Sequence, residues 1–125
     1  MVEQKITLAL KKILEQITSE RSDVSLFALL KMDELTEKWT VVLSAPWIND
    51  ATRDEAFYRV RDLLLANLSR DELQTIARIG IFEEKEHLIE LLIERYRTDD
   101  YIASDEKVNG NLIHEGYILA AKRTQ

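Results

Sequence analysis

The fold is decided by one stretch of the chain, Trp39-Thr-Val-Val-Leu-Ser-Ala-Pro-Trp47. Alternate side chains from Trp39 to Ala45 are apolar and fall on one face at a period of two, which is typical of a β-strand. Pro46 has no backbone N–H to give to a sheet, so we expect it to end the strand and start a turn. Both tryptophans of the protein bracket the stretch, and each can bury a large aromatic area. The sequence therefore predicts that this stretch is the central strand of a small sheet.

A second strand is predicted directly before the first. Residues Val24–Met32 are apolar on both faces of an extended chain, and the polar connection Asp33–Lys38 is short. Strands joined so closely usually pair as an antiparallel hairpin. A strand with two apolar faces belongs at the middle of a sheet. We therefore expect Val24–Met32 and Trp39–Ala45 to pair antiparallel at that place.

Helical patterns flank this hairpin. Residues 1–19 repeat apolar side chains at spacings of three and four, which predicts a helix with one buried stripe. The stripe consists of Val2, Ile6, Leu10, Ile13 and Ile17. Thr52 with Glu55, and again Ser69 with Glu72, have the spacing of a capping box, so a longer and a shorter helix are predicted to start there. The buried stripe of the longer helix is Ala56, Phe57, Val60, Leu63, Leu64 and Leu68.

The C-terminal half of the chain adds two strands around a third substantial helix. We interpret the end of Ile76–Phe82 and the segment Tyr117–Ala121 as strands, and Glu84–Arg97 as the helix. Asn109-Gly110 is a strong signal for a tight turn. Gly116 is interpreted as the mark of a bulge just before the last strand.

These elements predict an α+β fold in a single two-layer domain, residues 1–125, with helices packed on a small antiparallel or mixed sheet. The predicted order is helix, hairpin, helix pair, strand, helix, strand. A chain of 125 residues fits one domain and can bury a sufficient core. Three glycines and one proline in all leave few places for a domain boundary.

Composition and charge narrow the function classes. The formal net charge is −6, which raises the cost of approaching a phosphate backbone, so a nucleic acid is disfavoured as a partner. The absence of cysteine excludes disulfides, thiolate metal sites and a cysteine nucleophile. The first residues do not resemble the core of a signal peptide, and no apolar run approaches the roughly 18 residues that span a bilayer. We expect a cytoplasmic protein that has no membrane association.

Glu84 and His87 form a Glu-x-x-His pair, the unit found in di-iron carboxylate sites. Those sites need two such pairs and carboxylates from two further helices. The other histidine, His114, has no glutamate three residues before it. Acidic residues also favour the start of a helix, where the dipole and free amides stabilise them. We therefore expect no bound metal and no cofactor.

Three residues are candidates for binding a ligand. His114 and Glu115 are suited to proton transfer, although adjacent residues on a strand point to opposite faces unless a bulge intervenes. Trp47 follows a proline at a strand end, where it belongs either to the core or to the rim of a binding surface. No catalytic set converges in the sequence, and we assign no catalytic residue.

The helix Glu84–Arg97 predicts an interface. Its apolar residues sweep an arc of about 200°, more than one sheet usually covers. Either the helix is wedged between two layers, or its flank packs on another subunit, and Ile89, Ile93 and Tyr96 are then interface candidates. Tyr117 is a further candidate, because the final strand would alternatively pair edge to edge across a two-fold axis. The predicted partner is a second copy of the chain in a homodimer.

The leading hypothesis is a small non-enzymatic protein-interaction or regulatory module that acts as a homo-oligomer and binds itself or another protein. The alternative is a small-molecule-binding protein or an enzyme that uses carboxylates and His114 in a pocket at the sheet edge. A pocket lined by His114 and several acids would favour the alternative. An uncovered apolar flank on the helix Glu84–Arg97 would favour the first hypothesis.

Overall fold

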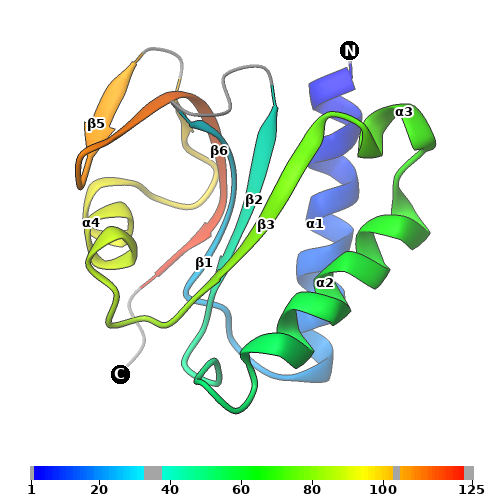
Figure 1. The fold of residues 1–125 in the computed structure, drawn as a ribbon, viewed down its shortest axis with the longest axis horizontal. Coiled ribbons are helices and arrows are strands. Elements are labelled where there is room, and N and C mark those ends of the chain that lie inside the picture. The colour runs from blue at the N-terminus through cyan, green and yellow to red at the C-terminus, as the bar shows by residue number, and fades with distance from the viewer. Residues whose placement is uncertain (1, 33–37, 103–104, 123–125) are drawn as a thin grey trace.

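The structure, a computed structural model, describes residues 2–32, 38–102 and 105–122 (Figure 1). Its helices are α1 (Val2–Glu20), α2 (Arg53–Asn67), α3 (Arg70–Leu73) and α4 (His87–Arg95). Its strands are β1 (Leu26–Met32), β2 (Trp39–Ser44), β3 (Ile76–Phe82), β4 (Tyr101–Ile102), β5 (Glu106–Val108) and β6 (Asn111–Ala121). The strands form one mixed sheet in the order β3-β2-β1-β6-β4, and β5 pairs with β6. The predicted α+β class is confirmed.

The predicted hairpin is confirmed as well. β1 and β2 pair antiparallel, from Leu26 opposite Ser44 to Leu30 opposite Thr40. β1 lies between β2 and β6, so β1 rather than β2 is the central strand. All of β2, and all of β1 except Lys31, is buried. Such burial is expected for strands that are covered on both faces.

Strand β3 runs parallel to β2, and α2 and α3 form the crossover between them. The capping box predicted at Ser69 is confirmed: Ser69 N–H donates to Glu72 Oε1 at 2.8 Å, and Glu72 N–H donates to Ser69 Oγ at 3.2 Å. The capping box predicted at Thr52 is wrong. The Thr52 hydroxyl donates to the Trp47 carbonyl oxygen at 2.8 Å and accepts from Asn49 N–H at 2.9 Å, so it stabilises the loop before α2 instead.

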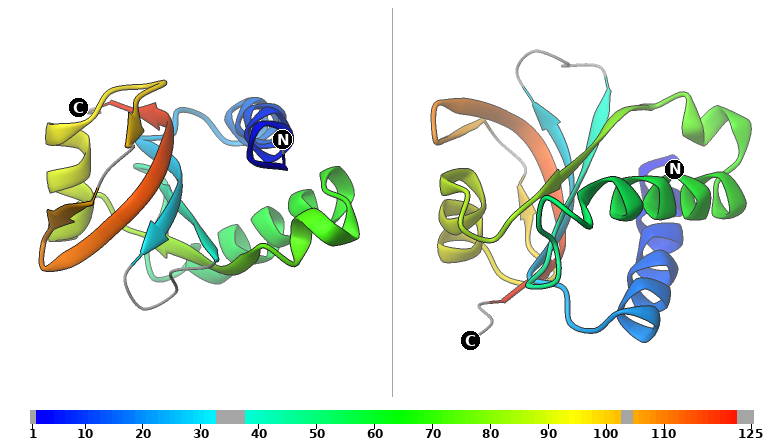
Figure 2. Two further views of the ribbon diagram at one scale, coloured as in Figure 1. Left: turned by 90° about the horizontal axis from the view of Figure 1, so that it is seen from above. Right: turned by 60° about the horizontal axis from the view of Figure 1, so that its bottom comes forward.

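Helices α1 and α2 cover one face of the sheet (Figure 2). Ile6, Leu10 and Ile13 of the predicted α1 stripe are fully buried, and Ile17 is 3% exposed. The alternate side chains of β2 that begin with Trp39 belong to the same cluster, as the period of two predicts. The core consists of two clusters of buried side chains, and this one is the larger.

Helix α4 lies on the opposite face, so the sheet has helices on both faces and a third layer is added to the two predicted (Figure 1). Ile89 and Leu92 of α4 are fully buried and share a cluster with Leu26 of β1. Ile102 of β4 and Val108 of β5 join the same cluster, because the sheet curves around the helix. The wide apolar arc is thus largely covered within the chain. The helix spans His87–Arg95 and is shorter than the predicted Glu84–Arg97.

The last strand, β6, is longer than the predicted Tyr117–Ala121 because its first half pairs with β5. The predicted turn at Asn109-Gly110 joins these two strands, with φ angles of 51° and 78° that suit the tight turns of β-hairpins. A bulge lies at His114 rather than at Gly116, since Ile113 pairs with Met32 and Glu115 with Lys31, so that the register shifts between Ile113 and Glu115. Gly116 serves packing: a Cβ there would lie 2.7 Å from a methyl group of Leu30.

Candidate functional site

Strand β3 forms a free edge of the sheet. Within the described part of the chain β3 pairs with β2 on one side, and no strand pairs with its other side. Peptide N–H and C=O groups point alternately to the two sides of a strand, so β3 presents a row of them outward. Ala77 and Arg78 are exposed at this edge, and Ala77 is a bulge in the pairing with β2. An edge of this kind can accept a further strand.

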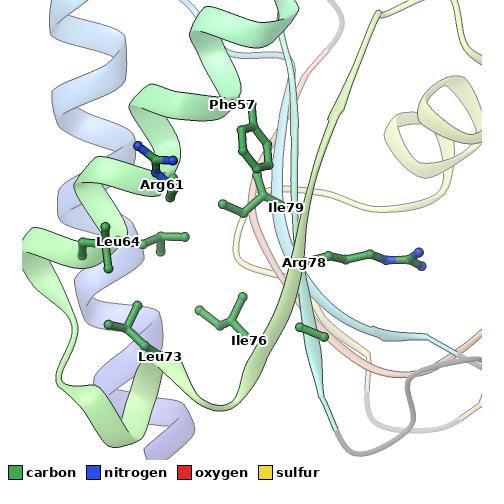
Figure 3. A pocket seen from close by; sticks show the side chains of 9 residues that line it. Phe57, Arg61, Leu64, Leu73, Ile76, Arg78 and Ile79 are labelled. Atoms are coloured by element: carbon green, nitrogen blue, oxygen red, sulfur yellow. The ribbon is translucent and has the colours of Figure 1, made fainter.

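A groove of about 330 Å³ lies between this edge and helix α2 (Figure 3). Its volume is at the lower end of the range for ligand sites. Its lining is mainly apolar and consists of Phe57, Leu64 and Leu65 from α2, Leu73 from α3, and Ile76, Ala77 and Ile79 from β3, with Arg61 and Arg78. In Figure 3 the side chains of Leu64, Leu73, Ile76 and Ile79 point toward one another across the space between helix and strand.

The groove exists because β3 is the last strand on this side of the sheet. Apolar residues of α2 and β3 are therefore left without a further strand to cover them. Leu63, Leu64 and Leu65 are consecutive on α2, and at 100° per residue they cannot all face the core. Leu63 and Leu64 are buried, whereas Leu65 is 58% exposed. Ile76 and Ile79 of β3 are partly buried, since the sheet has no further strand beside them. Exposed apolar side chains that gather in this way are typical of an interaction surface.

Two arginines, Arg61 and Arg78, are the charged residues among those that line the groove. Arg61 Nη2 is 3.2 Å from Asp62 Oδ1, and its guanidinium carbon is 4.9 Å from the centre of the Tyr58 ring. The side chains of Arg61 and Asp62 are 50% and 54% exposed, so this pair contributes little to stability. Arg78 extends from β3 on the side opposite to α2 (Figure 3). The guanidinium on the α2 side of the groove is thus that of Arg61, which is paired with Asp62, while that of Arg78 points away from the groove.

Trp47, the first ligand-binding candidate, is held against the core. Its indole Nε1–H donates to the Asp23 carbonyl oxygen at 3.2 Å, and the guanidinium carbon of Arg21 lies 5.3 Å from its ring centre. The cavity that Trp47 shares with Leu43 has a volume of about 10 Å³. That space holds at most one water molecule, so no larger ligand fits beside Trp47 as the side chains stand.

The other two ligand-binding candidates have different partners. His114 Nδ1 is 2.9 Å from Asp105 Oδ1, while Glu115 Oε1 is 3.5 Å from Lys31 Nζ. Glu115 Oε2 also accepts a hydrogen bond of 2.5 Å from the Tyr101 hydroxyl, which raises the pKa of Tyr101 to about 12. Neither candidate lines the groove, the cavity at Trp47 or a third cavity beside Ile93 and Lys122. The pocket on which the enzyme hypothesis depends is not among these three.

Two interface candidates on or after α4 belong to the chain's own core. Ile89 is fully buried, and Tyr96 is 7% exposed with its hydroxyl donating to Glu106 Oε1 at 2.9 Å. Burial and this hydrogen bond raise the pKa of Tyr96 to about 12. As the structure stands, neither side chain can contact a second subunit to any extent. Ile93 is partly buried and remains the candidate on this helix.

Tyr117, the candidate on β6, lies inside an aromatic row. Its ring centre is 5.8 Å from that of Trp39 and 4.7 Å from that of Tyr101. β6 pairs with β1 on one side and with β4 and β5 on the other. Beyond β4, Ile118 exchanges backbone hydrogen bonds with Asp99 and Asp100. The predicted edge-to-edge pairing of this strand is therefore wrong, because β6 is interior to the sheet.

Glu84 and His87 do not assemble a metal site among the described residues. Glu84 precedes α4 and accepts a hydrogen bond from the Ser25 hydroxyl, while His87 is exposed as the first residue of the helix. Residues 2–32, 38–102 and 105–122 contain no group of three or more histidine or acidic side chains that could hold a metal ion. The neighbouring Glu83 and Glu86 pair with Arg53 at 3.3 and 3.2 Å.

Comparison with known proteins assigns neither a family nor a function to this chain. No family model, no curated protein and no solved structure matches this chain. Of the helices in the described residues, none is long and apolar enough to cross a membrane. The groove therefore has to be interpreted from its own chemistry. Sequence reasoning missed it, although the run Leu63–Leu65 was a usable signal, since one of three consecutive leucines on a helix has to face outward.

Proposed function

We propose that this chain is a non-enzymatic protein-interaction module that binds an extended segment of polypeptide along strand β3. The observation that carries the proposal is the free edge of β3 beside an apolar groove. Strand addition uses both features at once. The backbone hydrogen bonds to the edge supply affinity, and a groove that takes alternate side chains supplies specificity.

The free edge of β3 and the apolar groove lie side by side, and the edge is only partly protected. Proteins commonly protect a free edge with charged side chains, bulges or a covering loop. Here β3 carries a bulge at Ala77 and a charge at Arg78, which limit open-ended growth of the sheet. The apolar groove beside it is left uncovered, with Leu65 at its mouth 58% exposed. An edge that is restricted but not covered suits the docking of one defined strand.

Panning a phage-displayed library of random linear peptides on the immobilised protein tests the proposal. We expect binders that bind the wild-type protein and lose binding to Leu65→Glu, because a carboxylate at the mouth of the groove repels an apolar side chain. Leu8→Glu is the matched control, since Leu8 on α1 is 59% exposed and does not line the groove. Both substitutions are at exposed helix positions, where effects on folding are small.

Hydrogen exchange supplies the second readout. A bound strand should slow exchange of the outward-facing amides of β3, because these amides gain hydrogen-bond partners. Binders that are indifferent to Leu65→Glu and leave β3 exchange unchanged would refute the proposal. Failure of the library to yield any binder would count against it in the same way.

A further inference from the structure

We propose that the segment bound along β3 is β3 of a second copy of this chain, paired antiparallel across a two-fold axis that passes through Ile79. This inference rests on the proposed function and names its partner. A free edge that pairs with its own copy is used up in both subunits, so the assembly closes at this edge and the sheet does not grow further there. The register of β3 and the charges along α2 both support this occupant.

The sequence of β3 is compatible with itself in this register. With Ile79 opposite its own copy, Arg78 of one copy lies opposite Gly80 of the other, so no like charge opposes the arginine. A Cβ on Gly80 would lie 2.7 Å from the ring of Phe82, so the aliphatic stem of Arg78 meets an aromatic ring there. Arg78 already has an interaction partner in its own chain, and this register leaves that interaction in place. An axis through Arg78 would instead oppose two guanidinium groups.

The apolar face of β3 is covered in the same arrangement. A two-fold axis perpendicular to the sheet keeps both α2 helices on one face, so the two copies of Ile79 face the same side of the joined sheet. Ile79 is partly buried and lines the groove, and no strand lies beside it in the single chain. Directly opposite Cβ atoms are about 4.5–5.5 Å apart, so each isoleucine packs against the other.

The charges along α2 are complementary across such an axis. Asp54, Phe57 and Arg61 lie within about 60° of one another around the helix. Phe57 and Arg61 line the groove, so Asp54 lies on the same flank of α2. An axis midway between Asp54 and Arg61 runs α2 antiparallel to its copy and brings each Asp54 beside the Arg61 of the other copy. Asp54 is exposed, and the pair of Arg61 with Asp62 is exposed and weak.

The strand and the helix place the axis at the same level of the molecule. The midpoint between Asp54 and Arg61 falls next to Phe57. Phe57 lies at the end of the groove that Ile79 lines, and Ile76 lies at the other end (Figure 3). One axis therefore satisfies both elements, which an unrelated strand would match only by chance. The net charge of −6 on each copy acts at longer range, where salt screens it beyond about 8 Å at physiological ionic strength.

Cysteine cross-linking tests the register directly, since the chain has no cysteine of its own. Ile79→Cys puts two thiols on opposite residues, whose Cα atoms are about 4.5–5.5 Å apart in an antiparallel pair and within reach of a disulfide. Under mild oxidation we expect a covalent dimer of twice the 14.6 kDa chain mass. Ile76→Cys is the matched control, because its two copies would lie about 20 Å apart. Absence of the Ile79→Cys dimer, or equal cross-linking of both variants, would overturn the inference.

Charge reversal tests the helix contact in sedimentation experiments over about 1–100 µM protein. Asp54→Arg and Arg61→Asp should each weaken the dimer about tenfold, because two attractive pairs become two repulsive ones. The double variant exchanges the charges in both copies and should restore the wild-type dissociation constant. Ile93→Glu on α4 is the control and should leave the dimer unchanged. A double variant as weak as the single variants would contradict the proposed axis.

The outcomes separate this inference from the proposed function. If the protein is a monomer at every concentration and displayed peptides lose binding to Leu65→Glu, strand docking stands and the second copy is wrong. If the protein is a monomer and no peptide binds, both are wrong. A dimer that dissociates in Ile93→Glu and not in the charge-reversed variants forms through α4, and it would overturn the β3 pairing.

Discussion

Leu43 is the residue whose truncation tests the core most directly. It is fully buried in β2, between Phe27 of β1 and Ile81 of β3 in the sheet, and shares its cavity with Ile17 of α1 and Val60 of α2. The neighbouring strands β1 and β3 and the two helices α1 and α2, which pack on the same face of the sheet, hold this site open, so it cannot collapse around an alanine. We therefore expect Leu43→Ala to cost about 3–4 kcal/mol, near the middle of the range for buried leucines.

The expected change in melting temperature follows from the chain length. An unfolding entropy of about 2.1 cal/mol/K per residue gives roughly 0.26 kcal/mol/K for this chain. Leu43→Ala should then lower the melting temperature by about 12–15 °C in a circular-dichroism or calorimetric scan. Leu8→Ala removes the same atoms at a position that is 59% exposed and should change it by less than about 2 °C. A shift for Leu43→Ala no larger than that of the control would refute the reasoning.

Four further outcomes are expected. Ser69→Ala should lower stability by about 1 kcal/mol in urea titrations, because Ser69 Oγ accepts the Glu72 N–H bond of the α3 capping box; an unchanged midpoint would show that this cap is dispensable. The raised pKa of Tyr96, about 12 against an ordinary value of 10, favours its neutral form in the folded state, so its contribution should be complete below pH 10 and lost as pH rises through 12. Tyr96→Phe should therefore flatten this part of the pH profile of the urea midpoint, and an unaltered profile would contradict the assignment. If the sequence-based homodimer forms through α4, light scattering should give about twice the 14.6 kDa chain mass and Ile93→Glu should reduce it, whereas a monomer at every concentration would remove this interface. Metal analysis of untagged protein should find substoichiometric zinc, iron and manganese, and a stoichiometric metal that is lost in His87→Ala would overturn the expectation of no metal.

Local sequence patterns were sufficient for most of the fold. The period of two in Trp39–Ala45 placed its side chains on the correct faces, and the spacing of three and four gave the buried stripe of α1. The capping box failed at Thr52 and succeeded at Ser69, although both have an acid three residues later. The reason lies outside the motif: the Trp47 carbonyl and the Asn49 amide hold the Thr52 hydroxyl in the preceding loop.

The candidate site depends on strand order, which periodicity does not contain. A strand pattern at Ile76–Phe82 gives no sign that β3 pairs parallel with β2 at an edge, or that β6 lies inside the sheet. The interface expected at Ile89 and Tyr96 came from the apolar arc of one helix, and the curved sheet covers that arc within the chain. The groove beside β3 arises from the same tertiary arrangement. The sequence indicated only one part of this groove: one leucine of the run Leu63–Leu65 has to face outward, and in the structure it is Leu65.

The position of β1 has a consequence for biosynthesis. β1 needs β6 as one of its two neighbours, and in that pair Leu26 faces Ala121. A ribosome that has released β1 must therefore synthesise almost the whole of the described chain before this strand can complete its hydrogen bonds. Contacts of such long sequence separation form slowly, and the apolar strand stays exposed to other nascent chains in the meantime. The sheet of this domain can therefore be completed only when translation of the described chain is nearly finished.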